Sequence, residues 1–249
     1  MSSTPPNAEA TSDVVSAERV RPAVSITEVK QQWQSALPGE VGFWHTWLKS
    51  KGHVWPEAYA YRTDPNLAFQ WFIQPYCPSE DGARLRILDV GAGPMTALGK
   101  KWGNRTLDIV AIDPLAEDYD RILADTGHAP LVRTIKGDAE ALEAQFGANS
   151  FDFVWAQNCL DHMVDPFKAL HEMLAVVKPG RSVMLEHAVN EGETMAYDGL
   201  HQWNLCIRDK RFVIWRPDRT VDVNEMFKDV ADVTYEEKGS WLVVGLKKK

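Results

Sequence analysis

Polar side chains suited to acid–base chemistry gather in the second half of this 249-residue chain. The stretch 158–162 has the sequence NCLDH and contains Asp161 and His162, and it follows an apolar run that is typical of a strand. His187 follows the next such run, and His201 lies fourteen residues further on in a polar and aromatic stretch. An imidazole can remove a proton from a reacting group. We therefore take His162 and His187, with Asp161, as the candidate catalytic residues.

The binding of an acceptor molecule would need further side chains near these groups. We expect His201 to contact the substrate, and we expect Trp203 and Trp44 to form walls of its pocket, because flat aromatic faces suit sugars and rings. A plainer interpretation also stays open, in which His162 caps the following turn and His187 is a satisfied histidine at the core edge.

A glycine-rich turn at 89–94, of sequence DVGAGP, follows the first apolar strand. Glycine permits a tight turn and lets the backbone approach a ligand closely. In an open α/β sheet such a turn lies at the carboxyl ends of the strands, where ligands bind. Asp113 ends the second strand and can accept from both ribose hydroxyls of a nucleoside, and Asp138 follows the third strand and can accept from an adenine amino group. The pattern indicates a nucleoside site.

Strands and helices alternate around these residues, which indicates a parallel sheet with crossover helices. We predict strands at 85–90, 107–112, 131–135, 151–156 and 182–186 and helices at 96–102, 115–125, 139–146 and 166–177. After them we predict a hairpin of 205–207 with 212–215, a helix at 223–230 and closing strands at 233–235 and 241–246.

The composition divides the chain into three parts. Residues 1–22 are rich in Ser, Thr, Pro, Ala and Glu and favour a flexible tail. Residues 23–83 hold many tryptophans and favour a helical extension that forms a lid, although plain packing on the core explains the same pattern. Residues 84–249 form the domain that carries the sheet.

Charge and cysteine usage exclude several classes of function. The net charge is −8, and a nucleic-acid or membrane-surface protein usually carries a basic patch, so we expect neither partner. The three cysteines, with no C-x-x-C pair, favour reduced thiols in the cytoplasm. We find no long apolar run and no secretory signal. A monomer or a homodimer fits equally well.

The motifs LDVGAGP, AIDP, GDAE, FDFVWAQNCLDH and VVKPG occur in this order between residues 84 and 187. Together they resemble the class I S-adenosylmethionine (SAM)-dependent methyltransferases. The resemblance implies a Rossmann-like, doubly wound α/β fold whose seven-stranded, mostly parallel sheet has an antiparallel last strand. It also implies a SAM site in which Gly91 and Gly93 lie under the methionine part. The residues expected at that site are Asp89, Gly91, Ala92, Gly93, Asp113, Pro114, Asp138, Ala139 and Gln157.

Two alternatives bear on the cofactor. A dinucleotide-binding turn would prefer Gly or Ala at the position of Thr96, so SAM fits this turn better than NAD. Some relatives of the resembled family bind a divalent cation through a Glu-x-x-Glu-His pattern, and this chain has Asn158-x-x-Asp161-His162 in its place. The resemblance thus implies a Mg²⁺ site made of Asn158, Asp161, His162 and His187, with Glu191 as the alternative to His187, where the ion would hold and acidify a substrate hydroxyl pair.

The function that the resemblance implies is methyl transfer from SAM to a small polar acceptor. We expect a hydroxyl acceptor, such as a sugar or a glycan-like compound. Transfer to a nitrogen or a carboxylate, and a SAM-binding regulatory protein without catalysis, remain alternatives. Methylation of RNA 2′-hydroxyls is disfavoured by the acidic charge balance.

Overall fold

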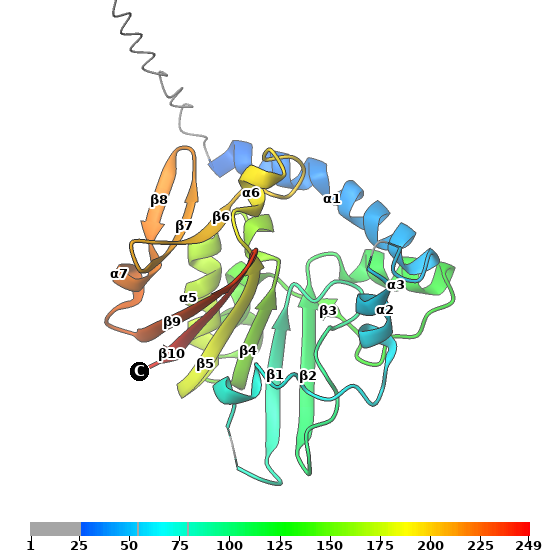
Figure 1. The fold of residues 1–249 in the computed structure, drawn as a ribbon. Helices are drawn as coiled ribbons and strands as arrows, with labels where there is room; N and C mark the ends of the chain where they lie inside the picture. The colour runs from blue at the N-terminus through cyan, green and yellow to red at the C-terminus, as the bar shows by residue number, and fades with distance from the viewer. Residues whose placement is uncertain (1–25, 54, 79) are drawn as a thin grey trace, which may run out of the picture.

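The computed structural model describes residues 26–53, 55–78 and 80–249, built around a seven-stranded sheet (Figure 1). The tail predicted at 1–22 and the first residues of the predicted extension lie outside the described residues. The strands of the sheet are β1 (Arg84–Val90), β2 (Thr106–Asp113), β3 (Ile135–Lys136), β4 (Phe151–Gln157), β5 (Val177–Ala188), β9 (Ala231–Lys238) and β10 (Trp241–Lys248). Their order is β3-β2-β1-β4-β5-β10-β9, and β10 runs antiparallel to both of its neighbours. The predicted fold class is confirmed.

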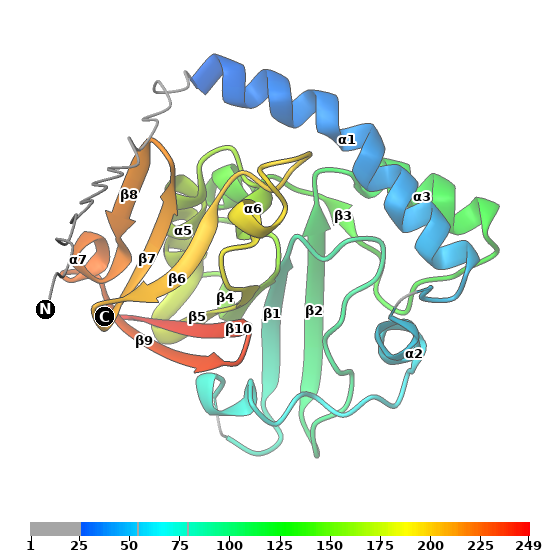
Figure 2. The same ribbon diagram turned by 45° about the horizontal axis from the view of Figure 1, so that its top comes forward.

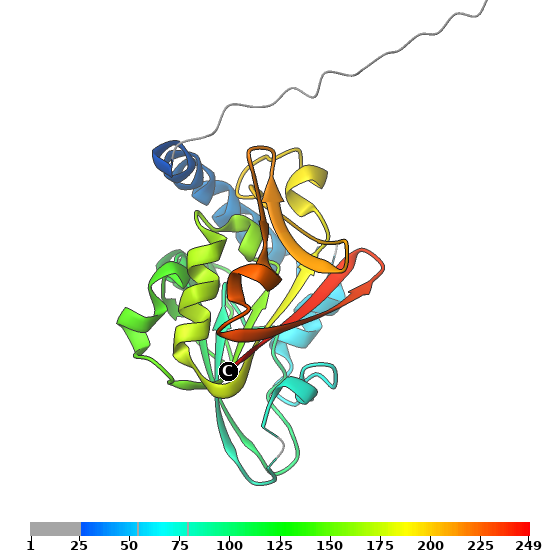
Figure 3. The ribbon, with the colours of Figure 1, turned by 90° about the vertical axis from the view of Figure 1, so that its left-hand side faces the viewer.

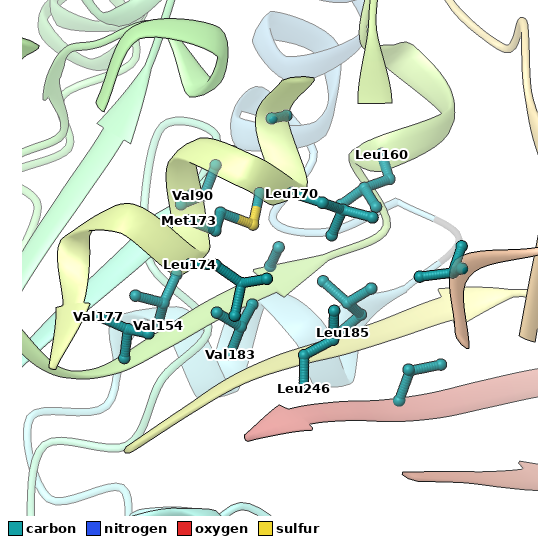
Figure 4. Close-up of a cluster of buried hydrophobic side chains, with 14 of the residues drawn as sticks. Val90, Val154, Leu160, Leu170, Met173, Leu174, Val177, Val183, Leu185 and Leu246 are labelled. Carbon is teal, nitrogen blue, oxygen red and sulfur yellow. The ribbon is translucent and has the colours of Figure 1, made fainter. Parts of the chain in front are cut away.

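One face of the sheet packs against α5 (Pro166–Val176). This helix begins at Pro166 because Asp165 caps it, with one side-chain oxygen accepting from two backbone amides of the first turn. Its buried residues Leu170, Met173 and Leu174 lie against Val154 and Val183 of the sheet (Figure 4). Burial of such side chains contributes about 1.5–3 kcal/mol each to stability.

The other face of the sheet is covered by residues that precede it in the chain. Side chains alternate along β1 and β4, so Ile87 and Phe153 point away from α5. They pack with Phe69 and Ile73, which lie just before the short helix η1 (Gln74–Tyr76). The pre-sheet segment is therefore part of the core.

A long helix, α1 (Ile26–Lys49), crosses the edge of the sheet at which the parallel strands end and then lies along α3 (Ala116–Asp125) (Figure 2). Trp47 and Leu48 near its end pack with Tyr119 of α3 and with Met95 of the glycine turn's loop. The short α2 (Pro56–Thr63) follows. The described part of the extension thus contains α1, α2 and η1, with irregular segments such as 64–73 between them, and α1 lies across the edge at which the parallel strands end. No helix among the described residues is long and apolar enough to cross a membrane.

A second, antiparallel sheet is inserted between β5 and β9 (Figure 3). It comprises β6 (Asn204–Arg208), β7 (Arg211–Arg216) and β8 (Arg219–Asp222), flanked by α6 (Glu191–Thr194) and α7 (Val223–Phe227). The hairpin of β6 and β7 was predicted. Strand β8 and helix α6 were not, because four-residue elements leave little periodicity to detect.

Three predicted elements differ from the structure. The helix expected at 96–102 is an irregular loop. The third strand holds two residues, Ile135–Lys136, instead of five, and it pairs at the sheet edge with the end of β2. The helix expected at 139–146 is a 3-10 turn (Ala139–Ala141) followed by the short α4 (Leu142–Phe146), since Asp138 caps the first turn.

Candidate active site

The glycine turn after β1 has the backbone shape expected of a close ligand approach. Gly91 and Gly93 have φ angles of +68° and +65°, a region that L side chains rarely adopt. The chain then continues as a loop, because residues 97–101 form hydrogen bonds with residues 67–70, which precede the sheet. The Gln70 side chain donates to Ala97 O at 2.7 Å and accepts from Gly99 N at 3.0 Å. The turn therefore lacks the adjacent helix N-terminus that would hold a pyrophosphate, which suits a nucleoside without one.

Asp89, at the end of β1, is buried beside an arginine that the sequence analysis did not single out. Thr96 Oγ1 donates to Asp89 Oδ2 at 2.5 Å, and burial raises the pKa of Asp89 to about 6. Arg62, from α2, donates to Ala92 O at 3.1 Å and also to Met95 O. A small cavity joins these groups; it is lined by Arg62, Asp89, Gly91, Ala92, Ala97, Trp155 and Gln157. A carboxylate and a guanidinium side by side match the ammonium and carboxylate of an α-amino acid.

Asp113 is the last residue of β2, and Asp138 comes two residues after the neighbouring strand β3. Asp113 accepts from Gly93 N at 3.2 Å and from Leu115 N at 2.9 Å, so it also braces the glycine turn. Burial raises its pKa to about 7. Gly137 N donates to Asp113 O at 3.3 Å, while the Asp138 side chain is exposed and accepts from Glu140 N.

Asp161 is the centre of a cluster of three histidines beyond β4 and β5. Asp161 Oδ1 lies 3.0 Å from His187 Nε2, and Oδ2 lies 2.6 Å from His201 Nδ1 and 3.5 Å from His162 Nε2. The two outer histidines approach each other, with His162 Nε2 3.1 Å from His201 Nδ1. The structure thus brings together His162, His187 and His201, which lie far apart in the sequence.

Burial and charge act in opposite directions inside this cluster. Burial raises the pKa of the Asp161 carboxyl, but the three histidines outweigh it and hold that pKa below its usual value. Burial lowers the pKa of His187, but Asp161 raises it above its usual value. The other ring nitrogen of His187, Nδ1, faces Ala188 O at 2.9 Å. Both ring nitrogens of His187 therefore face oxygens, and Nε2 also lies 3.5 Å from Asp161 N, so His187 holds Asp161 in place through its side chain and its backbone.

Cys159 connects the histidine cluster to the glycine turn. Its thiol donates to Val90 O at 3.3 Å, and its Cβ lies where a side chain at Gly91 would begin, 2.6 Å from an ideal Cβ there. Asp161 follows two residues later. The cluster is thus held against the turn by direct packing.

The remaining predicted residues take other places. Asn158 Oδ1 accepts from Ala188 N at 3.0 Å, so this amide ties the ends of β4 and β5 together. Trp203 is 1% exposed and its indole donates to Met163 O, so its side chain is buried in this structure. Trp44 instead lies against Gly93, 3.0 Å from an ideal Cβ there. The structure does not bring Trp44 and Trp203 together.

Sequence reasoning missed two polar residues at this edge, Arg62 and Glu40. Glu40 of α1 accepts from the Trp44 indole at 2.7 Å, and its charge acts on both Asp113 and His201. Glu191 of α6 acts on His187 and His201. Arg62 and Glu40 lie on helices that precede the sheet, and no local motif marks them.

Comparisons with known proteins agree with this geometry. A family model described as "Methyltransferase domain" matches residues 88–185. Over 100 residues the chain is 37% identical to a demethylmenaquinone methyltransferase of Renibacterium salmoninarum. This alignment covers 40% of this chain and 40% of that protein. Over 116 residues it is 36% identical to an uncharacterised methyltransferase of Mycobacterium tuberculosis, covering 47% of this chain and 42% of that one. The chain matches less than half the length of these curated relatives.

A solved structure extends the likeness over more of the chain. A chain in the complex between the Haloferax volcanii Trm112 methyltransferase activator and a methyltransferase superimposes with a TM-score of 0.55. The match covers 84% of this chain and 96% of that chain at 13% identity. At this identity the likeness concerns the fold.

Proposed function

We propose that this protein transfers a methyl group from SAM to a hydroxyl of a small polar acceptor, such as a sugar or a glycan-like compound. The match of residues 88–185 to a family model described as "Methyltransferase domain" and the likeness to a demethylmenaquinone methyltransferase support the methyl transfer. In that reaction the acceptor oxygen attacks the methyl carbon in line, the bond from carbon to sulfur breaks, and S-adenosylhomocysteine leaves. A neutral hydroxyl loses its proton during this step, whereas an amine or a carboxylate needs less help.

The donor side of the proposal rests on the residues around the glycine turn. Asp89 is suited to accept from the ammonium of SAM, and Arg62 is suited to pair with its carboxylate, since both border one small cavity. Asp113 and Asp138 follow neighbouring strands, which supports their assignment to the ribose and the adenine. Pro114, Ala139 and Gln157 are the neighbouring positions of the same proposed site.

The single observation that carries the acceptor side is the cluster of Asp161, His162 and His201, which follows Cys159, the residue that packs against the glycine turn. The Asp161 side chain is fully buried, whereas the side chains of His162 and His201 are 21% and 22% exposed. The imidazoles are therefore the part of the cluster that an acceptor reaches. Groups placed there can take the hydroxyl proton while the oxygen faces the methyl group. His187, which is buried, positions Asp161.

Helix α1 is proposed as the lid of this site. Glu40 acts on groups of both the donor and the acceptor side, and Trp44 lies on the glycine turn. A lid that touches both sides can exclude water from the methyl transfer and hold the two molecules in line.

The test has two stages. The first is calorimetric titration of the full chain with SAM and S-adenosylhomocysteine. The second is transfer of labelled methyl from SAM to fractionated metabolites and to a panel of sugars, diols, amines and carboxylates. Each assay compares the wild type with H162A, H201A and the control H45A, whose histidine pairs with Asp125 on the outer surface.

We expect SAM affinity to stay within about twofold in all three variants, because none of these histidines borders the SAM cavity. We expect H162A and H201A to lose about 100-fold or more of the turnover on a hydroxyl acceptor. Absence of SAM binding at millimolar concentration would overturn the whole proposal. SAM binding with no transfer to any acceptor class would instead favour a regulatory protein, and transfer unchanged in both variants would remove the histidines from the chemistry.

A further inference from the structure

Three atoms with lone pairs converge at the exposed side of the histidine cluster. They are Asp161 Oδ2, His201 Nδ1 and His162 Nε2, separated from one another by 2.6, 3.1 and 3.5 Å. Hydrogen bonds alone satisfy this arrangement poorly. If His201 Nδ1 donates its one proton to Asp161, it has no lone pair left for His162 Nε2. If His162 donates to His201 instead, an unprotonated nitrogen faces a carboxylate oxygen at 2.6 Å.

A divalent cation satisfies the same three atoms at once. An ion about 2.1 Å from each of them, a normal distance for imidazole and carboxylate ligands, would lie about 1 Å out of the plane of the three atoms. No ligand atom has to move far to allow this. The three ligands would occupy one face of the ion, and the opposite face would stay open to water or to the acceptor.

A second observation at this site also points to a bound ligand. Glu191 Oε2 is buried and accepts no hydrogen bond. An oxygen of Glu191 lies within 4.8 Å of ligand atoms of Asp161 and His187. A buried carboxylate oxygen without a donor costs free energy, and a water or hydroxyl held on a neighbouring cation would supply the missing donor.

We propose that Asp161, His162 and His201 bind one divalent first-row transition cation, such as Mn²⁺, Fe²⁺ or Zn²⁺, and that Glu191 accepts a hydrogen bond from the water or acceptor hydroxyl on its open face. Two imidazole nitrogens and one carboxylate oxygen suit these cations, whereas Mg²⁺ prefers oxygen ligands and retains water. The cation would polarise and acidify the acceptor hydroxyl, and Glu191 would take its proton, because imidazole nitrogens that bind the cation have no lone pair left for it. This inference rests on the proposed function for its chemistry, but not for its ligand set.

The structure changes the ligand set expected from the sequence. The oxygen of Asn158 already accepts from Ala188 N, and both ring nitrogens of His187 face oxygens. These two residues support the ligands: Asn158 fixes the strand ends, and His187 orients Asp161. His201 takes the place that the sequence analysis gave to His187.

The experiment measures binding directly, without turnover. The full chain is stripped with a chelator, dialysed and titrated with Co²⁺, whose visible d–d bands report nitrogen and oxygen ligation, and with Mn²⁺ and Zn²⁺ by calorimetry. The variants are H162A, H201A and E191Q, and the control is H45A. Thermal unfolding of each stripped variant checks that it folds. H162A provides a second ligand deletion at a partly exposed side chain, should H201A unfold.

We expect one Co²⁺ per chain in the wild type and in H45A. We expect H162A and H201A to weaken binding by more than about 100-fold and E191Q by about 10-fold. Absence of stoichiometric binding in the wild type, or equal binding in H162A and the wild type, would overturn the inference.

The outcome is separable from that of the proposed function. Methyl transfer that persists in a stripped, chelator-treated chain would refute the cation's role in the transfer and leave the histidines as bases. Stoichiometric cation binding without any methyl transfer would support the site and refute the proposed activity.

Discussion

Replacement of Gly91 by alanine tests whether the histidine cluster is held in place by the glycine turn. The new Cβ would lie 2.6 Å from Cys159 Cβ and 2.8 Å from its sulfur, distances at which something must shift. Gly127 provides a matched control, because it has a similar φ of +71° but nothing within 4 Å of its Cβ position. The backbone cost of alanine at positive φ is about 1–2 kcal/mol at either site.

The difference between the two variants isolates the contact with Cys159. Overpacking of this kind costs about 1–3 kcal/mol, so G91A is expected to lose about 2–5 kcal/mol of unfolding free energy and G127A about 1–2 kcal/mol. Urea titration followed by tryptophan fluorescence measures both. Replacing Cys159 by glycine in the G91A background removes both contacting atoms. The double variant should therefore recover most of the extra loss of unfolding free energy in G91A, so that the effects of the two substitutions are not additive in a double-mutant cycle.

The same substitution should act on turnover. Cys159 precedes Asp161 by two residues, and displacement of catalytic groups by about 1 Å can cost about 100-fold in rate. G91A should therefore lose turnover of labelled methyl far beyond any loss in G127A. Equal destabilisation in the two variants, or full activity in a folded G91A, would refute the idea that this packing contact positions the cluster.

Three further predictions concern single charges. Arg62→Met should weaken SAM binding by about 10- to 150-fold in calorimetry, since a hydrogen bond to a charged group contributes about 1.5–3 kcal/mol, while Arg121→Met, at an exposed position of α3, should not. Burial raises the pKa of Asp113 to about 7, so its contribution to the stability of the SAM-free chain is complete below about pH 4 and is lost as the pH rises to about 7. Urea titrations between pH 5 and 8 should therefore show a flatter pH dependence in D113N than in the wild type. Asp161→Asn should lower the unfolding free energy by about 3–5 kcal/mol, because it leaves the buried His187 without its charge partner, and a loss below 1 kcal/mol would contradict that pairing.

The sheet was predictable from the sequence because its strands carry their own signals. The runs that became β1, β4 and β5 are buried on both faces and read as continuous apolar segments. The loop at 96–102 was not predictable, since its conformation is fixed by Gln70 and by close packing of Gly99 on Ala68, both long-range contacts. Local propensity does not contain that information.

The candidate site divides in the same way. Asp161 and His162 stand in a motif after a strand, so the sequence located them. The sequence singled out His201 but not its contact with Asp161, which lies 40 residues away, and it gave no sign of Arg62, which reaches the glycine turn from a helix 30 residues upstream. Such residues become visible when the fold brings them to the same edge. Trp203 was expected to form a wall of the acceptor pocket because its neighbours are polar, whereas its buried ring packs edge-on against Phe167 and its indole donates to Met163 O.

The pairing of residues 97–101 with the pre-sheet segment bears on how this protein can be divided. Gln70 supplies both a donor and an acceptor to the loop behind the glycine turn, and an ideal Cβ on Gly99 would lie 2.1 Å from Ala68 O. A truncated chain that began at Arg84 would expose these partners and lose Arg62 as well. Residues 88–185, which match the methyltransferase family model, therefore depend on the preceding helices and cannot simply be moved without them. Any exchange of the N-terminal helices between relatives, in the laboratory or in evolution, would have to preserve the contacts of Ala68 and Gln70 with the loop at 97–101, or change that loop at the same time.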